Sequence, residues 1–283
     1  MTPEHLKTVI AANLPSLLSI AYRAGEAILE VYGTAFTVEQ KEDRSPLTKA
    51  DRRSHEIIVK ELERLKDLQI PVLSEEGKNI PFSERAEWQL FWLVDPLDGT
   101  KEFIKRNGEF TVNIALIQKG RPLAGIIHVP VRNITYFAAE GLGSFRLDRA
   151  GEHADLLLPV LLETAVRLPL HTPEALRIAV IGSRSHMSEE TAQYITELKS
   201  RYREVDFVSA GSSLKFCLIA EGSADVYPRF APTMEWDTAA GQAIVELAGG
   251  VVLETSSQTP LRYNKEKLTN PWFLARGAGI RSA

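Results

Sequence analysis

The apolar run Leu90–Val94, which leads directly into the acidic segment Asp95–Thr100 (DPLDGT), constrains the fold more than any other stretch. Strands that are buried on both faces are nearly continuous in apolar residues, so the run predicts a buried strand that ends at Val94. Ligands usually meet the chain where strands of mixed sheets end, and Asp95 and Asp98 follow this strand. The proline and glycine of the segment favour a turn that directs both carboxylates and the Leu97 carbonyl to one side.

These hard oxygen donors are of the kind that Mg²⁺ prefers, but the pattern alone favours a plain Asp-Gly turn. Glu75 and Glu76 follow another short apolar stretch, Ile70–Leu73, and taken alone they are solvated surface acids. Asp51 and Asp237 each lie at the predicted start of a helix, where Asp is a frequent N-cap. Each of these signals is weak by itself.

Composition limits the class of protein. A chain of 283 residues that is 44% hydrophobic can bury the core of one large domain or of two closely packed halves. A formal net charge of −4 gives no basic patch for a nucleic-acid polymer, whereas small anionic ligands are compatible with it. The single cysteine, Cys217, has no partner for an intrachain disulfide, which fits a reducing compartment. The N-terminus lacks a signal-peptide pattern and the longest apolar stretch, Leu156–Leu162, is too short to span a bilayer, so we expect a cytoplasmic protein.

Hydrophobic periodicity separates two regions. The first is predicted to hold two helices, over 6–31 with a break near Pro15 and over 50–65, and three antiparallel strands, Phe110–Gln118, Leu123–His128 and Ile134–Ala139. The second is predicted to alternate strands (Ile178–Ile181, Val205–Val208, Ala224–Tyr227, Val251–Leu253) with helices (Ser188–Lys199, Ser213–Glu221, Thr238–Ala248). We interpret Asp148–Pro173 as a connecting segment in which Leu156–Leu162 is buried or, alternatively, forms an apolar contact surface. The chain is therefore predicted to have halves at residues 1–150 and 174–283.

Five separated motifs carry a family resemblance: Leu47–Asp51 (LTKAD), Ser74–Glu76 (SEE), Trp92–Thr100 (WLVDPLDGT), Phe110–Ala115 (FTVNIA) and Glu235–Gly241 (EWDTAAG). In this order they resemble the motifs of the inositol monophosphatase superfamily of Mg²⁺-dependent, lithium-sensitive phosphatases. The resemblance covers nearly the whole chain, with no departure at the metal positions. It implies an α+β fold in which helix and sheet layers alternate as an αβαβα sandwich, with the two halves joined in one domain.

The resemblance also implies a metal site with two Mg²⁺ ions. The first ion would be held by Glu75, Asp95 and the Leu97 carbonyl, and the second by Asp95, Asp98 and Asp237.

Two further roles follow from the same resemblance. A third, weaker ion near Asp51 and Glu76 is compatible with it. Asp51, paired with the hydroxyl of Thr100, would orient the attacking water and deprotonate it as general base.

Other stretches resemble a narrower group, the bacterial 3′(2′),5′-bisphosphate nucleotidases of the CysQ type. Gly182–His186 is similar to their phosphate-contacting turn, and Gly211–Gly222 with Ala224–Arg229 to their nucleotide-binding stretch. The implied reaction is hydrolysis of the 3′-phosphate of adenosine 3′,5′-bisphosphate, with 3′-phosphoadenosine 5′-phosphosulfate as a further candidate substrate. The residues expected to bind substrate are Gly99, Thr100, Ser183, His186, Ser212, Lys215, Arg229 and Asp237.

The second phosphate of such a substrate needs cationic partners, which Lys215, Arg229 and His186 can provide together with backbone N–H groups near Ser212. Taken alone, Lys215 is interpreted as an exposed helix lysine and Arg229 as a surface loop residue.

Alternatives stay open at this point. An inositol-phosphate or sugar-phosphate phosphatase would carry the same metal motifs. A non-catalytic module that binds Mg²⁺ and a nucleotide is disfavoured by the Asp51 and Thr100 pair, and a calcium-binding structural protein by the lack of EF-hand spacing. The resemblance also admits a homodimer and a peripheral association with the cytoplasmic face of the bacterial inner membrane.

Overall fold

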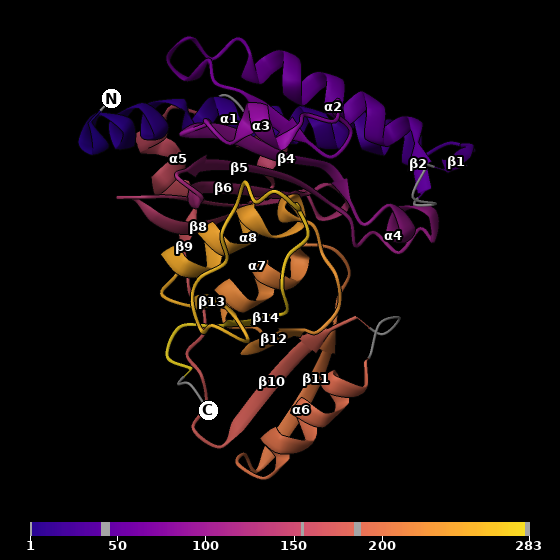
Figure 1. Cartoon of the computed structure of the whole chain (residues 1–283), viewed down its shortest axis with the longest axis vertical. Coiled ribbons are helices and arrows are strands. Elements are labelled where there is room, and N and C mark those ends of the chain that lie inside the picture. Colours follow the sequence, from indigo (N-terminus) through magenta and orange to yellow (C-terminus); the bar gives the residue numbers. More distant parts are fainter. Residues whose placement is uncertain (1, 41–45, 154–155, 184–187, 281–283) are drawn as a thin grey trace.

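Helix and sheet layers alternate through the molecule in this computed structural model (Figure 1). Helices α1 (Pro3–Tyr32) and α2 (Lys49–Leu62) cover one face of a seven-stranded sheet. Helices α7 (Leu214–Glu221) and α8 (Glu235–Leu247) lie between that sheet and a five-stranded sheet, and α6 (Glu189–Lys199) packs on the far face of the second sheet. The αβαβα arrangement expected from the sequence is confirmed. The structure describes residues 2–40, 46–153, 156–183 and 188–280.

The seven-stranded sheet has its strands in chain order, from β3 to β9. Strands β3 and β4 are parallel, and every later neighbour is antiparallel. The bounds are β3 Val72–Ser74, β4 Leu90–Asp98, β5 Thr111–Gln118, β6 Arg121–Val129, β7 Ile134–Ala139, β8 Gly143–Asp148 and β9 Val166–Arg167. The three antiparallel strands predicted between 110 and 139 are therefore confirmed.

The five-stranded sheet has the order β11-β10-β12-β14-β13. Strands β11, β10 and β12 run parallel, while β14 is antiparallel to both of its neighbours. The bounds are β10 Arg177–Gly182, β11 Glu204–Ser209, β12 Val226–Arg229, β13 Val251–Glu254 and β14 Phe273–Arg276. The predicted alternation of helices and strands is confirmed, and β14 is an element that the sequence pattern did not indicate.

Strand β4 lies at the centre of the core. Phe91 and Leu93 pack into the hydrophobic cluster between the two sheets, and Trp92 and Val94 pack into the cluster beneath α1 and α2. All four side chains are at most 1% exposed. Because alternate residues of a strand point to opposite faces, a strand covered on both sides is apolar at every position, as predicted for this run.

Helix α1 is continuous, so the break predicted near Pro15 is wrong. A proline inside a helix removes one backbone hydrogen bond and crowds the preceding turn. Here the apolar face continues on both sides of the proline: Leu14, Leu17 and Leu18 are at most 5% exposed in the same cluster as Ile10. Burial of a large apolar side chain stabilises by about 1.5–3 kcal/mol, and several of them on one face outweigh the local cost of Pro15.

The segment predicted as a simple connection carries structure of its own. Strand β8 ends in it, α5 spans Leu158–Thr164, and β9 extends the seven-stranded sheet. Leu161 is buried while Val160 is 46% exposed, so α5 is an amphipathic helix that is only partly buried. The expectation of a buried stretch is therefore wrong for most of its residues, because only one face of α5 meets the core.

Short elements complete the fold. They are β1 Val38–Gln40, β2 Pro46–Thr48, α3 Phe82–Arg85, α4 Thr100–Ile104 and the 3₁₀ helices Lys66–Leu68, Pro130–Arg132 and Ala150–His153. Within the described ranges, none of the helices combines the length and the apolar character that crossing a bilayer requires. The division into halves at 1–150 and 174–283 stays a prediction.

Candidate metal and phosphate site

A β-bulge in β4 brings Asp95 and Asp98 to the same side of the strand. Asp95 is opposite Asn113 of β5 and Asp98 is opposite Thr111, so two residues of β4 face one residue of β5 between these pairs. In a regular strand, residues three apart point to opposite faces, and the extra residue of a bulge cancels that difference. Pro96 lies inside the bulge, where its missing N–H breaks no regular ladder. The strand therefore runs to Asp98, and the predicted end at Val94 is wrong.

Local contacts fix the bulged segment. The backbone N–H of Leu97 donates to Oδ1 of Asp95 at 3.0 Å, and the hydroxyl of Ser54 donates to the Pro96 carbonyl at 2.6 Å. Gly99 has φ +94°, which a residue with a side chain rarely adopts, and a Cβ there would lie 3.2 Å from the Glu109 carbonyl oxygen. The tight turn expected here thus exists, but it follows the bulge and begins α4.

Parallel pairing of β3 with β4 places Glu75 beside Asp95. Ser74 pairs with Val94, and the Glu75 backbone N–H donates to the Val94 carbonyl at 3.1 Å. Glu75 and Glu76 are both half-buried, so the interpretation of solvated surface acids is wrong. Strand β3 therefore ends beside the start of the bulge in β4, and the acidic residues of both strands gather there.

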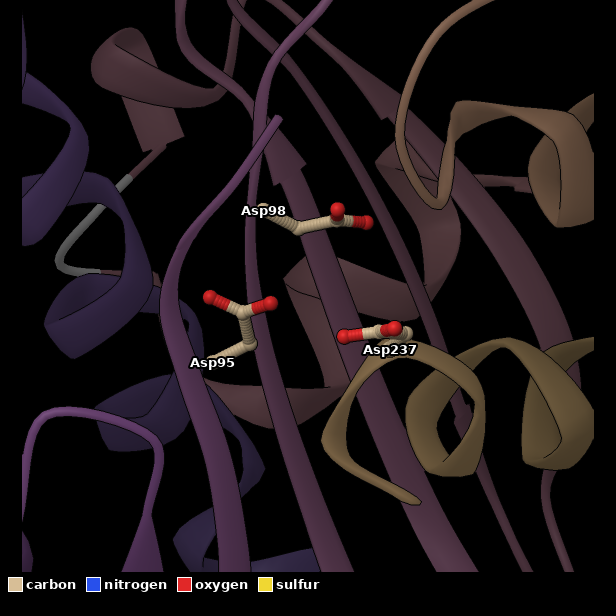
Figure 2. A group of neighbouring side chains, drawn as sticks. All are labelled: Asp95, Asp98 and Asp237. Atoms are coloured by element: carbon tan, nitrogen blue, oxygen red, sulfur yellow. The ribbon is translucent and has the colours of Figure 1, made fainter. Parts of the chain in front are cut away.

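Asp237 completes the cluster from helix α8. It lies in the first turn of α8, and its Oδ2 accepts a hydrogen bond from the backbone N–H of Met234 at 2.8 Å. It therefore caps the helix from its third position and is not the N-cap itself. Figure 2 shows its carboxyl group directed toward those of Asp95 and Asp98. One oxygen from each of these three residues lies within 4.8 Å of the others.

The electrostatics of the cluster favour a cation. Burial raises the pKa of Asp95 well above its ordinary value, and the charges of its acidic neighbours, first of them Glu75, raise it further. Burial also raises the pKa of Asp237, with the charge of Asp98 as the next cause. A divalent ion offsets this repulsion, and carboxylate and carbonyl oxygens are the donors of hard cations. The residues present therefore fit an ion such as Mg²⁺.

A second polar pair lies beside the cluster. Oδ2 of Asp51 accepts from the backbone N–H of Thr48 at 2.7 Å and from the Thr48 hydroxyl at 2.6 Å, which caps α2. Its Oδ1 lies 3.2 Å from the hydroxyl of Thr100, which is also 3.5 Å from the Leu97 carbonyl oxygen. Burial raises the pKa of Asp51, and the charge of Glu76 adds to the rise. Thr48 is the N-cap, so Asp51 combines a capping contact with one toward the bulge.

A cavity of about 160 Å³ opens next to the carboxylates. It is lined by most of the residues predicted to bind substrate: Gly99, Ser183, Ser212, Lys215, Arg229 and Asp237. Asp98 also lines it, so two carboxylates of the acidic cluster share one space with the residues predicted to bind substrate. Thr100 lies next to Gly99 at the start of α4. His186 lies outside the described residues.

Lys215 and Arg229, the cationic residues considered for phosphate binding, are less exposed than each was expected to be from the sequence alone. Lys215 is only 6% exposed, and its Nζ donates to the Ser212 carbonyl at 2.6 Å and lies 5.4 Å from the centre of the Tyr227 ring. Burial lowers the pKa of Lys215 to about 8, although the charge of Asp98 opposes the decrease. Arg229 is half-buried and donates to the Pro232 carbonyl at 2.9 Å. The interpretation of Lys215 as an exposed helix lysine is wrong.

Sequence reasoning missed three polar residues of the site. The Ser213 hydroxyl lies 2.6 Å from Oδ2 of Asp98, and Asn113 Nδ2 lies 2.9 Å from the Ser213 hydroxyl. Glu102 lines the cavity, and burial raises its pKa. One signal was present: Asn113 interrupts the apolar strand Thr111–Gln118, where a buried amide requires hydrogen-bond partners.

Comparison with known proteins adds an independent finding. Residues 10–279 match the model of the inositol monophosphatase family. The chain is 44% identical over 262 residues to 3′(2′),5′-bisphosphate nucleotidase CysQ of Salmonella typhimurium, covering 92% of this chain and 98% of that protein. It is 45% identical over 263 residues to CysQ of Escherichia coli K12, again covering 92% and 98%. The crystal structure of CysQ from Bacteroides thetaiotaomicron is 47% identical, covers 96% of this chain and 98% of that one, and has a TM-score of 0.83.

Proposed function

Because the chain belongs to the inositol monophosphatase family, we propose that it hydrolyses the 3′-phosphate of adenosine 3′,5′-bisphosphate to AMP and inorganic phosphate. Its relatives from Salmonella typhimurium and Escherichia coli are named 3′(2′),5′-bisphosphate nucleotidases. One observation carries the proposal: Lys215 and Arg229 line the same cavity as Asp98 and Asp237. The cavity thus offers cationic groups for one phosphate and carboxylates that suit the cations of phosphate hydrolysis.

We infer that Mg²⁺ is the physiological ion. Glu75, Asp95 and the Leu97 carbonyl would hold one ion, and Asp95 with Asp98 and Asp237 a second. Bound ions of this kind lower the pKa of a water molecule and neutralise charge on the phosphate and on the departing oxygen. The clustering of three carboxyl groups within 4.8 Å supports this assignment.

A third, more weakly bound ion would lie near Glu76 and Asp51. The charge of Glu76 acts on Asp51, which supports a site that the two carboxyl groups share.

Asp51 and Thr100 move the proton in the proposed reaction. A water oxygen forms a bond to phosphorus as its proton leaves, and the bond between phosphorus and O3′ breaks. The departing O3′ takes up a proton from bulk water, to which Asp51 later returns the proton that it accepted. The Thr100 hydroxyl donates to Asp51 Oδ1 and keeps its lone pairs free to accept from the attacking water. Asp51, held by Thr48 through its other oxygen, accepts the proton as general base.

The second phosphate of the substrate is assigned to Lys215 and Arg229, with Ser183 and Ser212 as further contacts from the cavity wall. The buried ammonium group of Lys215 forms a stronger hydrogen bond with a phosphate oxygen than an exposed lysine would. Inositol 1-phosphate has no second phosphate, so it cannot use these groups. The same contacts would accommodate 3′-phosphoadenosine 5′-phosphosulfate.

A phosphate-release panel tests the proposal. Adenosine 3′,5′-bisphosphate, inositol 1-phosphate and fructose 1,6-bisphosphate are compared at equal concentration while Mg²⁺ is titrated. We expect the nucleotide to have the highest kcat/KM and the reaction to require Mg²⁺. A preference for the inositol ester would assign the chain to another activity of the family, and tight nucleotide binding without phosphate release would indicate a non-catalytic module. Homodimer formation and peripheral membrane association stay predictions. Light scattering would test the first, and co-sedimentation with vesicles the second.

A further inference from the structure

The hydroxyl of Ser213 joins residues from both sides of the acidic cluster. Its Oγ lies 2.6 Å from Asp98 Oδ2, 2.7 Å from the carbonyl oxygen of Asp237 and 2.9 Å from Asn113 Nδ2. These neighbours belong to β4, α8 and β5, while Ser213 itself precedes α7. Ser213 is 2% exposed and Asn113 is 1% exposed, so bulk water does not replace these contacts.

The chemistry of the groups sets the direction of each hydrogen bond. An amide NH₂ only donates, so the Ser213 oxygen accepts from Asn113. The single hydroxyl proton is then left for the carboxylate of Asp98 or the carbonyl of Asp237. An ionised carboxylate is the stronger acceptor. Asn113 therefore orients the hydroxyl, whose proton forms the stronger bond with Asp98 Oδ2 and is shared with the Asp237 carbonyl, so the hydroxyl holds Asp98 next to the backbone of Asp237.

Such a connection matters because Asp98 and Asp237 repel each other. Their carboxylates belong to the group whose oxygens lie within 4.8 Å, in a partly buried position where water screens charge poorly. Asp98 is carried by a strand of the seven-stranded sheet, whereas Asp237 is carried by a helix that follows a strand of the other sheet. Mg²⁺ requires near-ideal octahedral geometry, so ligands that are already held at the right separation bind it more tightly.

We propose that Ser213, oriented by Asn113, is a positioning residue that sets the separation between Asp98 and Asp237 and thereby the affinity of this pair for a divalent cation. The inference rests on the metal site proposed above. Residues that hydrogen-bond to metal ligands typically change metal affinity about 10- to 100-fold when they are replaced. Ser213→Ala is therefore expected to weaken Mg²⁺ binding within that range.

The test measures Mg²⁺ binding to the substrate-free protein by isothermal titration calorimetry, together with the metal-free unfolding midpoint. Thr135→Val is the matched control. Thr135 is also fully buried, and its hydroxyl makes one hydrogen bond, 2.8 Å from His128 Nδ1, on β7. Both variants lose a buried hydroxyl, but only Ser213→Ala should raise the Kd for Mg²⁺.

Asn113→Ala provides the second arm, because it leaves the Ser213–Asp98 hydrogen bond in place and removes the amide that orients the Ser213 hydroxyl and that also lies 3.5 Å from Asp98 Oδ2. It should weaken Mg²⁺ binding less than Ser213→Ala, and the double variant should bind no more weakly than Ser213→Ala alone. If Ser213→Ala does not fold, an unchanged Kd in Asn113→Ala overturns the inference. An unchanged Kd in folded Ser213→Ala also overturns it, whereas wild-type protein that binds no Mg²⁺ would refute the metal site itself.

Discussion

The hydroxyl of Thr100 lies 3.2 Å from Oδ1 of Asp51, which links the segment after β4 to the start of α2. The other oxygen of Asp51 is occupied by Thr48, so only Oδ1 faces the bulged segment. The same threonine hydroxyl approaches the Leu97 carbonyl oxygen. The Thr100 hydroxyl therefore contacts both Asp51, the proposed proton acceptor, and the carbonyl of Leu97, a predicted metal ligand.

Thr100→Val and Thr100→Ser test this pair. Thr100→Val removes the hydroxyl and should lower kcat about 10²-fold or more, the usual contribution of a positioned proton-transfer group, while Mg²⁺ affinity stays within a few-fold of wild type. Thr100→Ser keeps the hydroxyl and should retain most of kcat. Steady-state kinetics at saturating Mg²⁺ give the answer. Equal activity of the two variants would show that the Thr100 hydroxyl takes no part in the proton transfer.

Lys215→Met tests the second-phosphate site. A hydrogen bond to a charged group contributes about 1.5–3 kcal/mol, so the variant should lose at least 10-fold in kcat/KM for adenosine 3′,5′-bisphosphate. Adenosine 3′-phosphate, which lacks the 5′-phosphate, is the matched control substrate, and its kcat/KM should change little. An equal loss of kcat/KM with both substrates would show that Lys215 does not act by binding the 5′-phosphate.

The lowered pKa of Lys215 predicts a pH dependence. Burial lowers this pKa to about 8, so the side chain is charged below that pH and loses its proton as the pH rises through it. The ratio of kcat/KM for adenosine 3′,5′-bisphosphate to that for adenosine 3′-phosphate should therefore fall between about pH 7 and pH 9. Lys215→Arg keeps its charge and should give a flatter profile. A wild-type ratio that does not change with pH would contradict the assignment.

The raised pKa values of Asp95 and Asp237 predict how Mg²⁺ stabilises the fold. An acid whose pKa is higher in the folded state stabilises that state when it is protonated, and this contribution is lost as the pH rises through the folded-state pKa. The metal-free protein should thus lose this stabilisation toward neutral pH, and added Mg²⁺ should restore it. Unfolding midpoints with and without Mg²⁺ should diverge as the pH increases from acid to neutral. A constant difference would argue against coupling between these carboxyl groups and the ion.

Local patterns predicted a large part of the fold. The run Leu90–Val94 was recognisable because a strand covered on both faces is apolar at every position. The order of the acidic motifs indicated the family, and the structure brings Asp95, Asp98 and Asp237 together. The roles of these residues stay predictions.

Features that depend on contacts between distant segments could not be predicted from the sequence. The bulge after Val94 follows from the pairing of β4 with β5, and the burial of Lys215 follows from the position of α7 between the two sheets. The continuity of α1 through Pro15 depends on the core that its apolar face meets. The hydrogen bond between Ser213 and Asp98 joins residues whose proximity only the folded chain creates.

Asp98→Asn gives the most direct test of the account. The substitution keeps the size of the side chain and its contact with Ser213, and removes one of the charges that repel one another in the cluster, so the variant should fold with a metal-free unfolding midpoint at least as high as that of wild type. Phosphate release from adenosine 3′,5′-bisphosphate is then measured as Mg²⁺ is titrated, in wild type and variant together. We predict that Asp98→Asn is folded and releases no measurable phosphate at any Mg²⁺ concentration. A folded variant with a near-normal Mg²⁺-dependent rate would contradict the assignment of this cluster as the metal site that drives hydrolysis.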